Sequence, residues 1–285
     1  MNRTLVILNP SARGERAKTL FEKITQLAKN AVVRMTSEPG EVRSLAGSAA
    51  AEGFATVVAA GGDGTINEIV NGIAESDVAL GVLPMGTMNV FATELGLPSG
   101  DLDKCWAVIQ AGKCRAIDLP RAGGHYFVQL SGIGLDAQVV QETSWDLKRS
   151  FGPLSYLVSI AQVAARKPPR LVVKSDSRVD EGSFVLIGNG RFYGGPFVMF
   201  KDARIDDGLL DVLIFKNVSY FDIARYLQGI IFGTHSSLPD VEYFQARNIA
   251  VHSEDKVPVE ADGDVIGELP VTFRFSPHKL KVLVP

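Results

Sequence analysis

Residues 57–68 read VVAAGGDGTINE, and this stretch is the most informative part of the chain. The four small apolar residues predict a buried strand, and the glycines allow the backbone to approach a ligand closely. A helix that begins directly after the glycines presents free N–H groups, which favour phosphate. Asp63 would repel bare phosphate but suits phosphate that is bound with a divalent cation. The stretch therefore predicts a metal–nucleotide site, and the alternative is a tight turn after a strand.

The same order of strand, polar turn and helix occurs twice more, in residues 5–14 (LVILNPSARG) and 79–92 (ALGVLPMGTMNVFA). Three such units within about ninety residues predict a parallel α/β sheet with right-handed crossovers. Ligands of such sheets bind at the carboxyl ends of the strands. The apolar spacing predicts further helices at 17–28, 42–50 and 102–110 and strands at 31–35 and 115–119.

The pattern changes near residue 119, where short strand-like runs separated by turn residues begin. These runs predict an antiparallel, β-rich second domain. We expect a first domain over residues 1–118 and a second over 119–276. The expected strands are 125–130, 170–174, 182–187, 209–215, 241–251 and 271–275, with helical inserts at 153–165 and 220–231.

Composition limits the classes of function. The chain has 285 residues and a net charge of −3, without the basic excess of a general nucleic-acid binder. No secretory signal is visible, and no apolar run reaches the roughly 20 residues that span a bilayer. Cys105 and Cys114 lack metal-site spacing, so we expect reduced thiols and a cytoplasmic protein, although the sequence leaves a disulfide open. The sequence does not indicate an oligomeric state.

Several motifs together carry a family resemblance. The GGDGT of residues 61–65 also occurs in NAD kinases and phosphofructokinases, whereas the LPMGTMN of residues 83–89 is more specific. With these motifs the chain resembles the diacylglycerol kinase catalytic family, which includes sphingosine kinases and bacterial YegS-like lipid kinases. The resemblance also rests on Asn9-Pro10, GIGLDA at 132–137, GNG at 188–190, YGG at 193–195, DGLLD at 207–211 and DGD at 262–264.

The resemblance implies an NAD kinase- or phosphofructokinase-like α/β domain for the nucleotide, followed by a β-rich antiparallel domain for a lipid acceptor. It implies an active site in the cleft between the two domains. It also suggests that the end of the chain, about residues 277–285, returns to the first domain.

The resemblance implies binding of ATP and Mg²⁺, with Asp63 coordinating the metal. Other interpretations fit some of the residues in this set: Thr36 is also a turn residue, Thr87 and Asn89 are good helix N-caps, and Glu68 suits a helix dipole. The expected nucleotide-binding residues are Thr36, Gly61, Gly62, Asp63, Gly64, Thr65, Ile66, Asn67, Glu68, Gly86, Thr87 and Asn89.

The expected catalytic residues are Asp264, Asp262 and Asp63. Family members usually carry Asp-Gly-Glu where this chain has Asp262-Gly263-Asp264, and the acidic residue after the glycine is the general base. Asp264 is one methylene shorter than glutamate, which puts its role in doubt or shifts the work to Asp262. The alternative is an exposed turn.

A second metal site is implied at residues 204–209. In bacterial members an aspartate and backbone carbonyls in this segment hold a structural Mg²⁺. The matching ligands here are the Asp207 side chain and the carbonyls of Arg204 and Leu209. A hairpin turn at Asp-Asp-Gly fits the same residues.

We therefore expect an ATP-dependent lipid kinase that phosphorylates a lipid alcohol such as diacylglycerol at a membrane surface or in micelles. Alternatives are an NAD kinase-like enzyme with a soluble acceptor and a non-catalytic protein that binds lipid or nucleotide. A peripheral membrane location is a further expectation. Basic residues around the helix at 153–165 favour contact with anionic lipid, or form an ordinary solvated face: Lys148, Arg149, Arg166, Lys167 and Arg170. The four histidines are expected to be surface or core residues.

Overall fold

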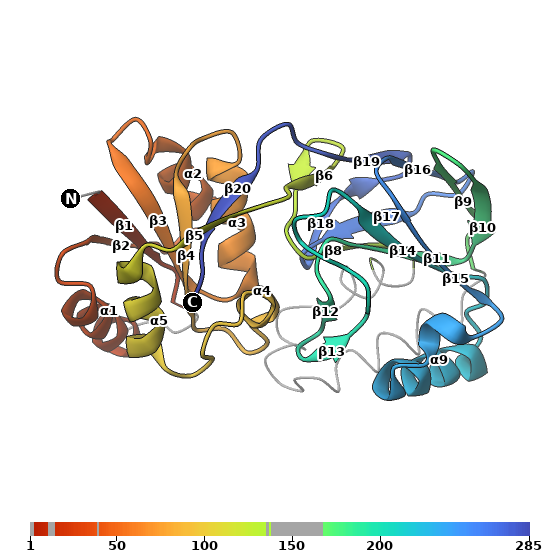
Figure 1. Ribbon diagram of the computed structural model, residues 1–285, viewed down its shortest axis with the longest axis horizontal. Coiled ribbons are helices and arrows are strands. Elements are labelled where there is room, and N and C mark those ends of the chain that lie inside the picture. The colour runs from red at the N-terminus through yellow and green to blue at the C-terminus, as the bar shows by residue number, and fades with distance from the viewer. Residues whose placement is uncertain (1–2, 11–14, 39, 135–136, 138–167) are drawn as a thin grey trace.

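The computed structural model describes residues 3–10, 15–38, 40–134, 137 and 168–285. Figure 1 shows two domains side by side, with the blue C-terminal strand lying in the domain that also holds the N-terminus. The first domain contains a six-stranded sheet of order β2-β1-β3-β4-β20-β5. Its strands are β1 (Arg3–Leu8), β2 (Val32–Met35), β3 (Phe54–Gly61), β4 (Ala79–Pro84), β5 (Cys114–Ile117) and β20 (Leu280–Leu283).

Parallel pairing brings the carboxyl ends of three strands together. Leu8 of β1 pairs with Ala60 of β3, and Gly61 of β3 pairs with Pro84 of β4. The three polar turns that follow these strands therefore meet at one edge, as the sequence predicts. β20 runs parallel to β4 and antiparallel to β5, so the end of the chain completes this sheet.

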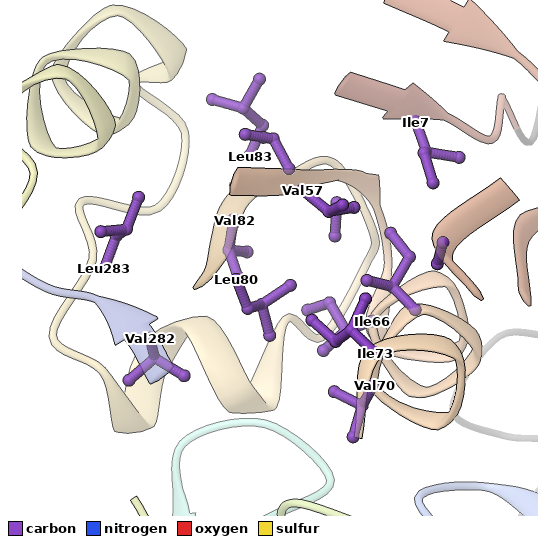
Figure 2. Close-up of a cluster of buried hydrophobic side chains, with 14 of the residues drawn as sticks. Ile7, Val57, Ile66, Val70, Ile73, Leu80, Val82, Leu83, Val282 and Leu283 are labelled. Carbon is purple, nitrogen blue, oxygen red and sulfur yellow. The ribbon is translucent and has the colours of Figure 1, made fainter. Parts of the chain in front are cut away.

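The helices of the first domain are α1 (Glu15–Leu27), α2 (Glu41–Ser48), α3 (Asp63–Ile73), α4 (Val90–Glu94) and α5 (Leu102–Ala111). Helix α3 turns Ile66, Val70 and Ile73 toward the sheet at i, i+4 and i+7 spacing (Figure 2). All three are at most 1% exposed, and burial of each stabilises the fold by about 1.5–3 kcal/mol. This packing holds the start of α3 at the edge where the turns meet.

The second domain is a pair of antiparallel sheets, of order β10-β9-β16-β19-β6-β7 and β15-β14-β11-β8-β17-β18, with a separate β12–β13 hairpin. Apolar side chains from both sheets form one core between them. The strands are β6 (Pro120–Ala122), β7 (His125–Tyr126), β8 (Leu130–Ile133), β9 (Leu171–Ser175), β10 (Val179–Gly182), β11 (Phe184–Gly188), β12 (Phe192–Tyr193), β13 (Phe197–Val198), β14 (Leu210–Phe215), β15 (Val241–Ala246), β16 (Ile249–His252), β17 (Pro258–Ala261), β18 (Asp264–Glu268) and β19 (Val271–Phe275).

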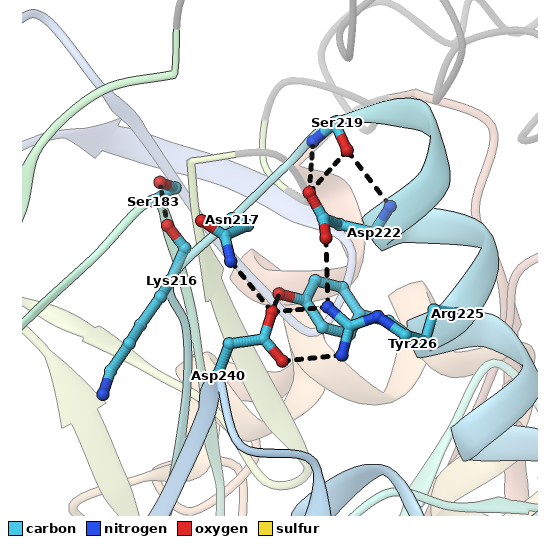
Figure 3. A network of polar contacts seen from close by, with 8 residues as sticks. All are labelled: Ser183, Lys216, Asn217, Ser219, Asp222, Arg225, Tyr226 and Asp240. Carbon is cyan, nitrogen blue, oxygen red and sulfur yellow. Dashed lines mark hydrogen bonds and ion pairs between the residues drawn. The ribbon is translucent and has the colours of Figure 1, made fainter.

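Helix α9 (Tyr220–Phe232) covers the outer face of the second of these sheets and is followed by a short 3₁₀ helix, His235–Ser237. The Tyr226 ring lies 4.9 Å from the ring of Phe215. Asp240 accepts hydrogen bonds from Arg225 and from the Tyr226 hydroxyl (Figure 3). The Arg225 guanidinium holds the pKa of Asp240 well below its usual range. These contacts fix one face of α9 on the domain.

Two of the expected strands differ in the structure. The run 241–251 is two strands, because β15 and β16 belong to different sheets and the chain crosses between them at residues 247–248. The run 125–130 is also divided, into β7 and β8. The expected helix at 153–165 and four of the five basic residues near it lie outside the described residues. Cys105 is buried and Cys114 exposed, and both are free thiols.

Candidate active site

The two glycine turns after β3 and β4 lie against each other. A Cβ on Gly86 would be 2.6 Å from the Cα of Gly62, and a Cβ on Gly62 would be 3.2 Å from the Cα of Gly86. The amide of Met85 also donates to the Gly61 carbonyl at 2.9 Å. Glycine is therefore needed at position 86, and a side chain at position 62 would force the neighbouring turn to shift by a few tenths of an ångström.

Asp63 joins the first glycine turn to helix α4. Its Oδ2 accepts from the Val90 amide and its Oδ1 from the Phe91 amide, both at 3.2 Å. The Asn89 side chain instead binds the backbone N–H and carbonyl of Gly86, each at 2.8 Å. The N-cap function that the sequence offered to Asn89 is therefore performed by Asp63. Burial raises the pKa of the Asp63 carboxyl, while these amides lower it.

The carboxylate of Asp63 fits a magnesium ion. Carboxylate oxygen is a preferred Mg²⁺ ligand, and each oxygen can take more than one partner beside the backbone amides that surround it here. The start of α3 has no side-chain cap, so its first amides point toward the same turn. This end of α3 thus combines a helix N-terminus with one acidic side chain.

The other expected nucleotide-binding residues divide into two groups. Gly64, Gly86 and Thr87 are exposed at the turns. Thr65 is buried and accepts from Asn9 Nδ2 at 3.2 Å, and buried Thr36 donates to the Leu8 carbonyl at 3.3 Å. The two threonines therefore support the turns, and the exposed group offers surface to a ligand.

Asn67 reaches across the junction between the domains. Its Nδ2 donates to Asp264 Oδ2 at 3.2 Å and to the Ala261 carbonyl at 3.4 Å, and its Oδ1 accepts from Asn71 Nδ2 at 2.7 Å. The residue is only 1% exposed. The structure thus brings together two residues that the sequence assigned to separate tasks, the nucleotide and the base.

Asn71 and His125 complete this network, and the sequence analysis did not single out either of them. Asn71 accepts from the Tyr126 amide at 2.9 Å and donates to the Tyr126 carbonyl at 2.8 Å, which defines the orientation of its amide. His125 Nε2 lies 3.3 Å from Asn71 Nδ2 and 3.4 Å from Asn67 Nδ2. Burial lowers the pKa of His125, which favours a neutral ring beside the two amides. The i, i+4 spacing of Asn67 and Asn71 was the available signal.

Asp262 and Asp264 stand in different surroundings. Asp262 has a φ of 48°, and its carboxylate accepts from the amides of Val128, Gln129 and Leu130 at 2.7, 3.0 and 3.0 Å. Burial raises the pKa of Asp262 to about 6. Asp264 is exposed at the start of β18, where its Oδ2 accepts from Asn67 Nδ2. The geometry therefore favours Asp264 for contact with a substrate and Asp262 for shaping the turn.

Glu68 lies on α3 near Asp264 and faces the start of α2. Burial raises the pKa of Glu68, and the charge of Asp264 acts in the same direction. The backbone amides of Arg43 and Gly40, at the N-terminus of α2, lower it. A role in joining α3 to α2 accounts for this position.

The segment 204–209 forms a turn of its own. Asp207 Oδ1 accepts from the Leu209 amide at 3.0 Å, and the Arg204 carbonyl accepts from the Asp207 amide at 3.4 Å. Asp118 accepts from the Gly208 amide at 2.7 Å and pairs with Lys279 at 2.8 Å. Within the described ranges, no three or more His, Cys, Asp or Glu side chains are grouped to hold a metal. A structural metal here stays a prediction.

An open pocket of about 470 Å³ borders the second glycine turn. It lies at the carboxyl end of β4, between the loop that ends in Asn89 and the start of α5. Its lining combines one lysine with two aspartates and the backbone of the turn. The residues are Lys23, Pro84, Met85, Gly86, Asn89, Gly100, Asp101, Leu102 and Asp103.

Comparison with known proteins gives consistent results over the whole chain. Residues 3–122 match the diacylglycerol kinase catalytic domain, and residues 130–284 match the YegS C-terminal NAD kinase beta sandwich-like domain. The chain is 29% identical to a diacylglycerol kinase of Bacillus subtilis, with 100% of this chain and 97% of that protein covered. It is 30% identical to a diacylglycerol kinase of Staphylococcus saprophyticus, with 99% and 95% covered.

A crystal structure of a putative diacylglycerol kinase from Bacillus anthracis has the same fold. It matches with a TM-score of 0.82 at 24% identity, over 100% of this chain and 97% of that one. In the described part of this chain, no helix is long and apolar enough to cross a membrane. The chain belongs to the diacylglycerol kinase family, a family of phosphotransferases that act on an alcohol group.

Proposed function

We propose that this protein is an ATP-dependent lipid kinase, which transfers the γ-phosphoryl group to the hydroxyl of a lipid alcohol such as diacylglycerol. One observation carries the proposal. Asn67, on the helix that begins at the glycine turn, donates to Asp264 of the second domain. A phosphate-binding helix start and a candidate base are therefore held at one junction. The names of the relatives support a diacylglycerol-like acceptor.

The triphosphate binds at the glycine turns in this proposal. The uncapped start of α3, which includes the exposed Gly64, offers amide donors, and Thr87 offers an exposed hydroxyl. Asp63 would hold Mg²⁺ through its carboxylate oxygens, which its amide contacts with α4 keep in place. When bound, Mg²⁺ neutralises charge on the transferring phosphoryl group. Thr36 and Thr65 act by supporting the turns.

Asp264 is the proposed general base. The lipid hydroxyl oxygen bonds to the γ-phosphorus, the bond from that phosphorus to the β–γ bridging oxygen breaks, and ADP leaves. The hydroxyl proton passes to Asp264. Asn67 holds Oδ2 of that carboxylate at 3.2 Å, so Oδ1 is the oxygen proposed to take the proton. Asp262 is engaged with three backbone amides and keeps the turn in place.

Transfer of labelled γ-phosphate from Mg·ATP tests the proposal. The acceptors are a panel of lipid alcohols in mixed micelles, with NAD as a soluble control. Label in a lipid product is expected and names the acceptor class. Label on NAD alone would replace the proposal with a soluble-acceptor kinase. ATP binding without label in any acceptor would favour a non-catalytic binding protein.

A further inference from the structure

The exposed face of helix α9 carries no charge. Asp222 and Arg225, the two charged residues of this helix, are both half-buried, whereas four large apolar side chains are 58–76% exposed. A surface helix ordinarily places its charged residues toward water. The six exposed positions are Tyr220, Phe221, Ala224, Gln228, Ile231 and Phe232.

These positions form one stripe. At 3.6 residues per turn, the six side chains fall within an arc of about 120°. Tyr220 and Ile231 lie almost on one line along the helix, and Phe221 and Phe232 lie on a second line beside it. The four large side chains, called here the α9 stripe, thus face the same way over the full length of the helix.

The polar network on the other side of α9 holds the stripe outward. The Ser219 hydroxyl caps the helix by accepting from the Asp222 amide, and Asp222 accepts from Arg225 at 3.0 Å (Figure 3). Asp240 accepts from Arg225 at 2.5 and 2.7 Å. Because the charges are paired against the domain, the apolar face is a built feature of the fold.

The stripe continues toward the site through the β12–β13 hairpin. β13 lies beside α9, and its two residues, Phe197 and Val198, are 45% and 40% exposed. Figure 1 shows β13 and α9 along the same lower edge of the second domain. In the turn of this hairpin, a Cβ on Gly195 would lie 3.8 Å from the methyl carbon of Met88. Met88 belongs to the second glycine turn.

We propose that the α9 stripe docks the second domain onto a lipid bilayer, with its four side chains inserted at the level of the headgroups. The proposal rests on the proposed function, because the acceptor of a lipid kinase lies in the bilayer. Aromatic and aliphatic side chains on one face of a helix are typical of such insertion. An uncharged stripe makes the docking hydrophobic, so it needs no anionic lipid.

The size of the stripe favours a bilayer over a second copy of the chain. Side chains of this kind have roughly 200 Å² each, so four of them at about two-thirds exposure present about 500 Å². A stable protein interface needs about 800 Å² from each partner. A bilayer sets no such minimum, because insertion strength grows with each apolar side chain.

Co-sedimentation with phosphatidylcholine vesicles tests the docking. The full chain is compared with the double variant Phe221→Ser, Phe232→Ser at low and high salt. Val179→Ser is the matched control, because Val179 is 63% exposed on β10, away from α9. We expect the double variant to lose about tenfold or more of the vesicle partition coefficient. The control should bind like the parent, and salt should change neither.

Two results would overturn the docking. One is equal vesicle binding by parent and double variant, including the absence of binding by both. The other is a parent dimer that the double variant converts to monomer in sedimentation, which assigns the stripe to a second copy. Urea unfolding confirms that the double variant is folded. Since vesicle binding needs no turnover, it can succeed where phosphate transfer fails, and the two proposals are judged separately.

Discussion

Helices α3 and α9 are of similar length and are amphipathic in opposite senses. α3 places its apolar side chains on the sheet and its amides, Asn67 and Asn71, at a buried junction where each has a partner. α9 uses its charged residues, Asp222 and Arg225, to attach itself and leaves apolar side chains outside. Polar groups are thus buried where they orient other groups, and apolar groups remain exposed where a non-aqueous partner covers them.

The largest effect is expected for Asp264→Asn, which removes the proposed base at the junction between the domains. An amide cannot accept the hydroxyl proton, and loss of a general base lowers turnover by about 10²–10⁴-fold. Phosphate transfer under saturating ATP measures the effect. ATP binding should be unchanged. Asp264→Glu is the companion variant, and a large gain in its turnover would show that the shorter carboxylate limits the reaction. Full activity of Asp264→Asn would remove Asp264 from the mechanism.

Asp63→Asn separates the two roles of Asp63. One amide oxygen still accepts from α4, so the variant should stay folded, whereas the negative charge toward the metal is lost. We expect turnover to fall by at least about tenfold, with partial recovery at higher Mg²⁺ concentration. A folded variant with unchanged ATP-dependent turnover would show that Asp63 serves α4 alone.

The variants Asn71→Ala on α3 and Gln228→Ala on α9 compare how much a polar side chain of each helix contributes to the free energy of unfolding. Removing Asn71 leaves the Tyr126 amide and carbonyl without their bonds in a buried place, so the free energy of unfolding should fall by about 1–3 kcal/mol. Gln228 is exposed on α9, and its replacement should stay within about 0.5 kcal/mol. Urea unfolding of both variants measures the difference. Equal losses would contradict the contrast between the helices.

Asp262 and Asp240 should change the free energy of unfolding with pH in opposite directions. Burial raises the pKa of Asp262 to about 6 in the fold, so its contribution is fully present below about pH 4 and is lost as the pH rises through 6. The Arg225 ion pair lowers the pKa of Asp240, so its contribution is present above about pH 4 and is lost as the pH falls. Stability curves of Asp262→Asn and Asp240→Asn should therefore deviate from the parent in opposite directions.

The sequence was sufficient for the parallel sheet and the meeting of the polar turns. Both follow from local patterns, an apolar run and then glycine, which need no knowledge of distant residues. The break between β15 and β16 was not visible, because the run 241–251 stays strand-like through the point where the chain changes sheets. Pairing with distant strands decides that break.

The junction was only partly predictable for a similar reason. Asn67 belongs to a motif that suggests a nucleotide contact, yet its partner is 197 positions away in the chain. The sequence also did not show which face of α9 packs on the domain, because both faces are apolar and the apolar spacing does not distinguish them. The nucleotide, catalytic and metal assignments and the domain boundary at 118/119 stay predictions.

The return of β20 to the first sheet gives the two domains a double connection. The chain crosses between the domains after β5 and again before β20, and Figure 1 shows the two crossings close together. The Ser276 amide donates to the Leu119 carbonyl at 2.8 Å, which ties one crossing to the other. The two domains are therefore joined by two neighbouring segments of chain and not by a single linker. A fragment that ends at residue 118 would lack the strand between β4 and β5, so the first domain cannot be cut out as one continuous piece of chain.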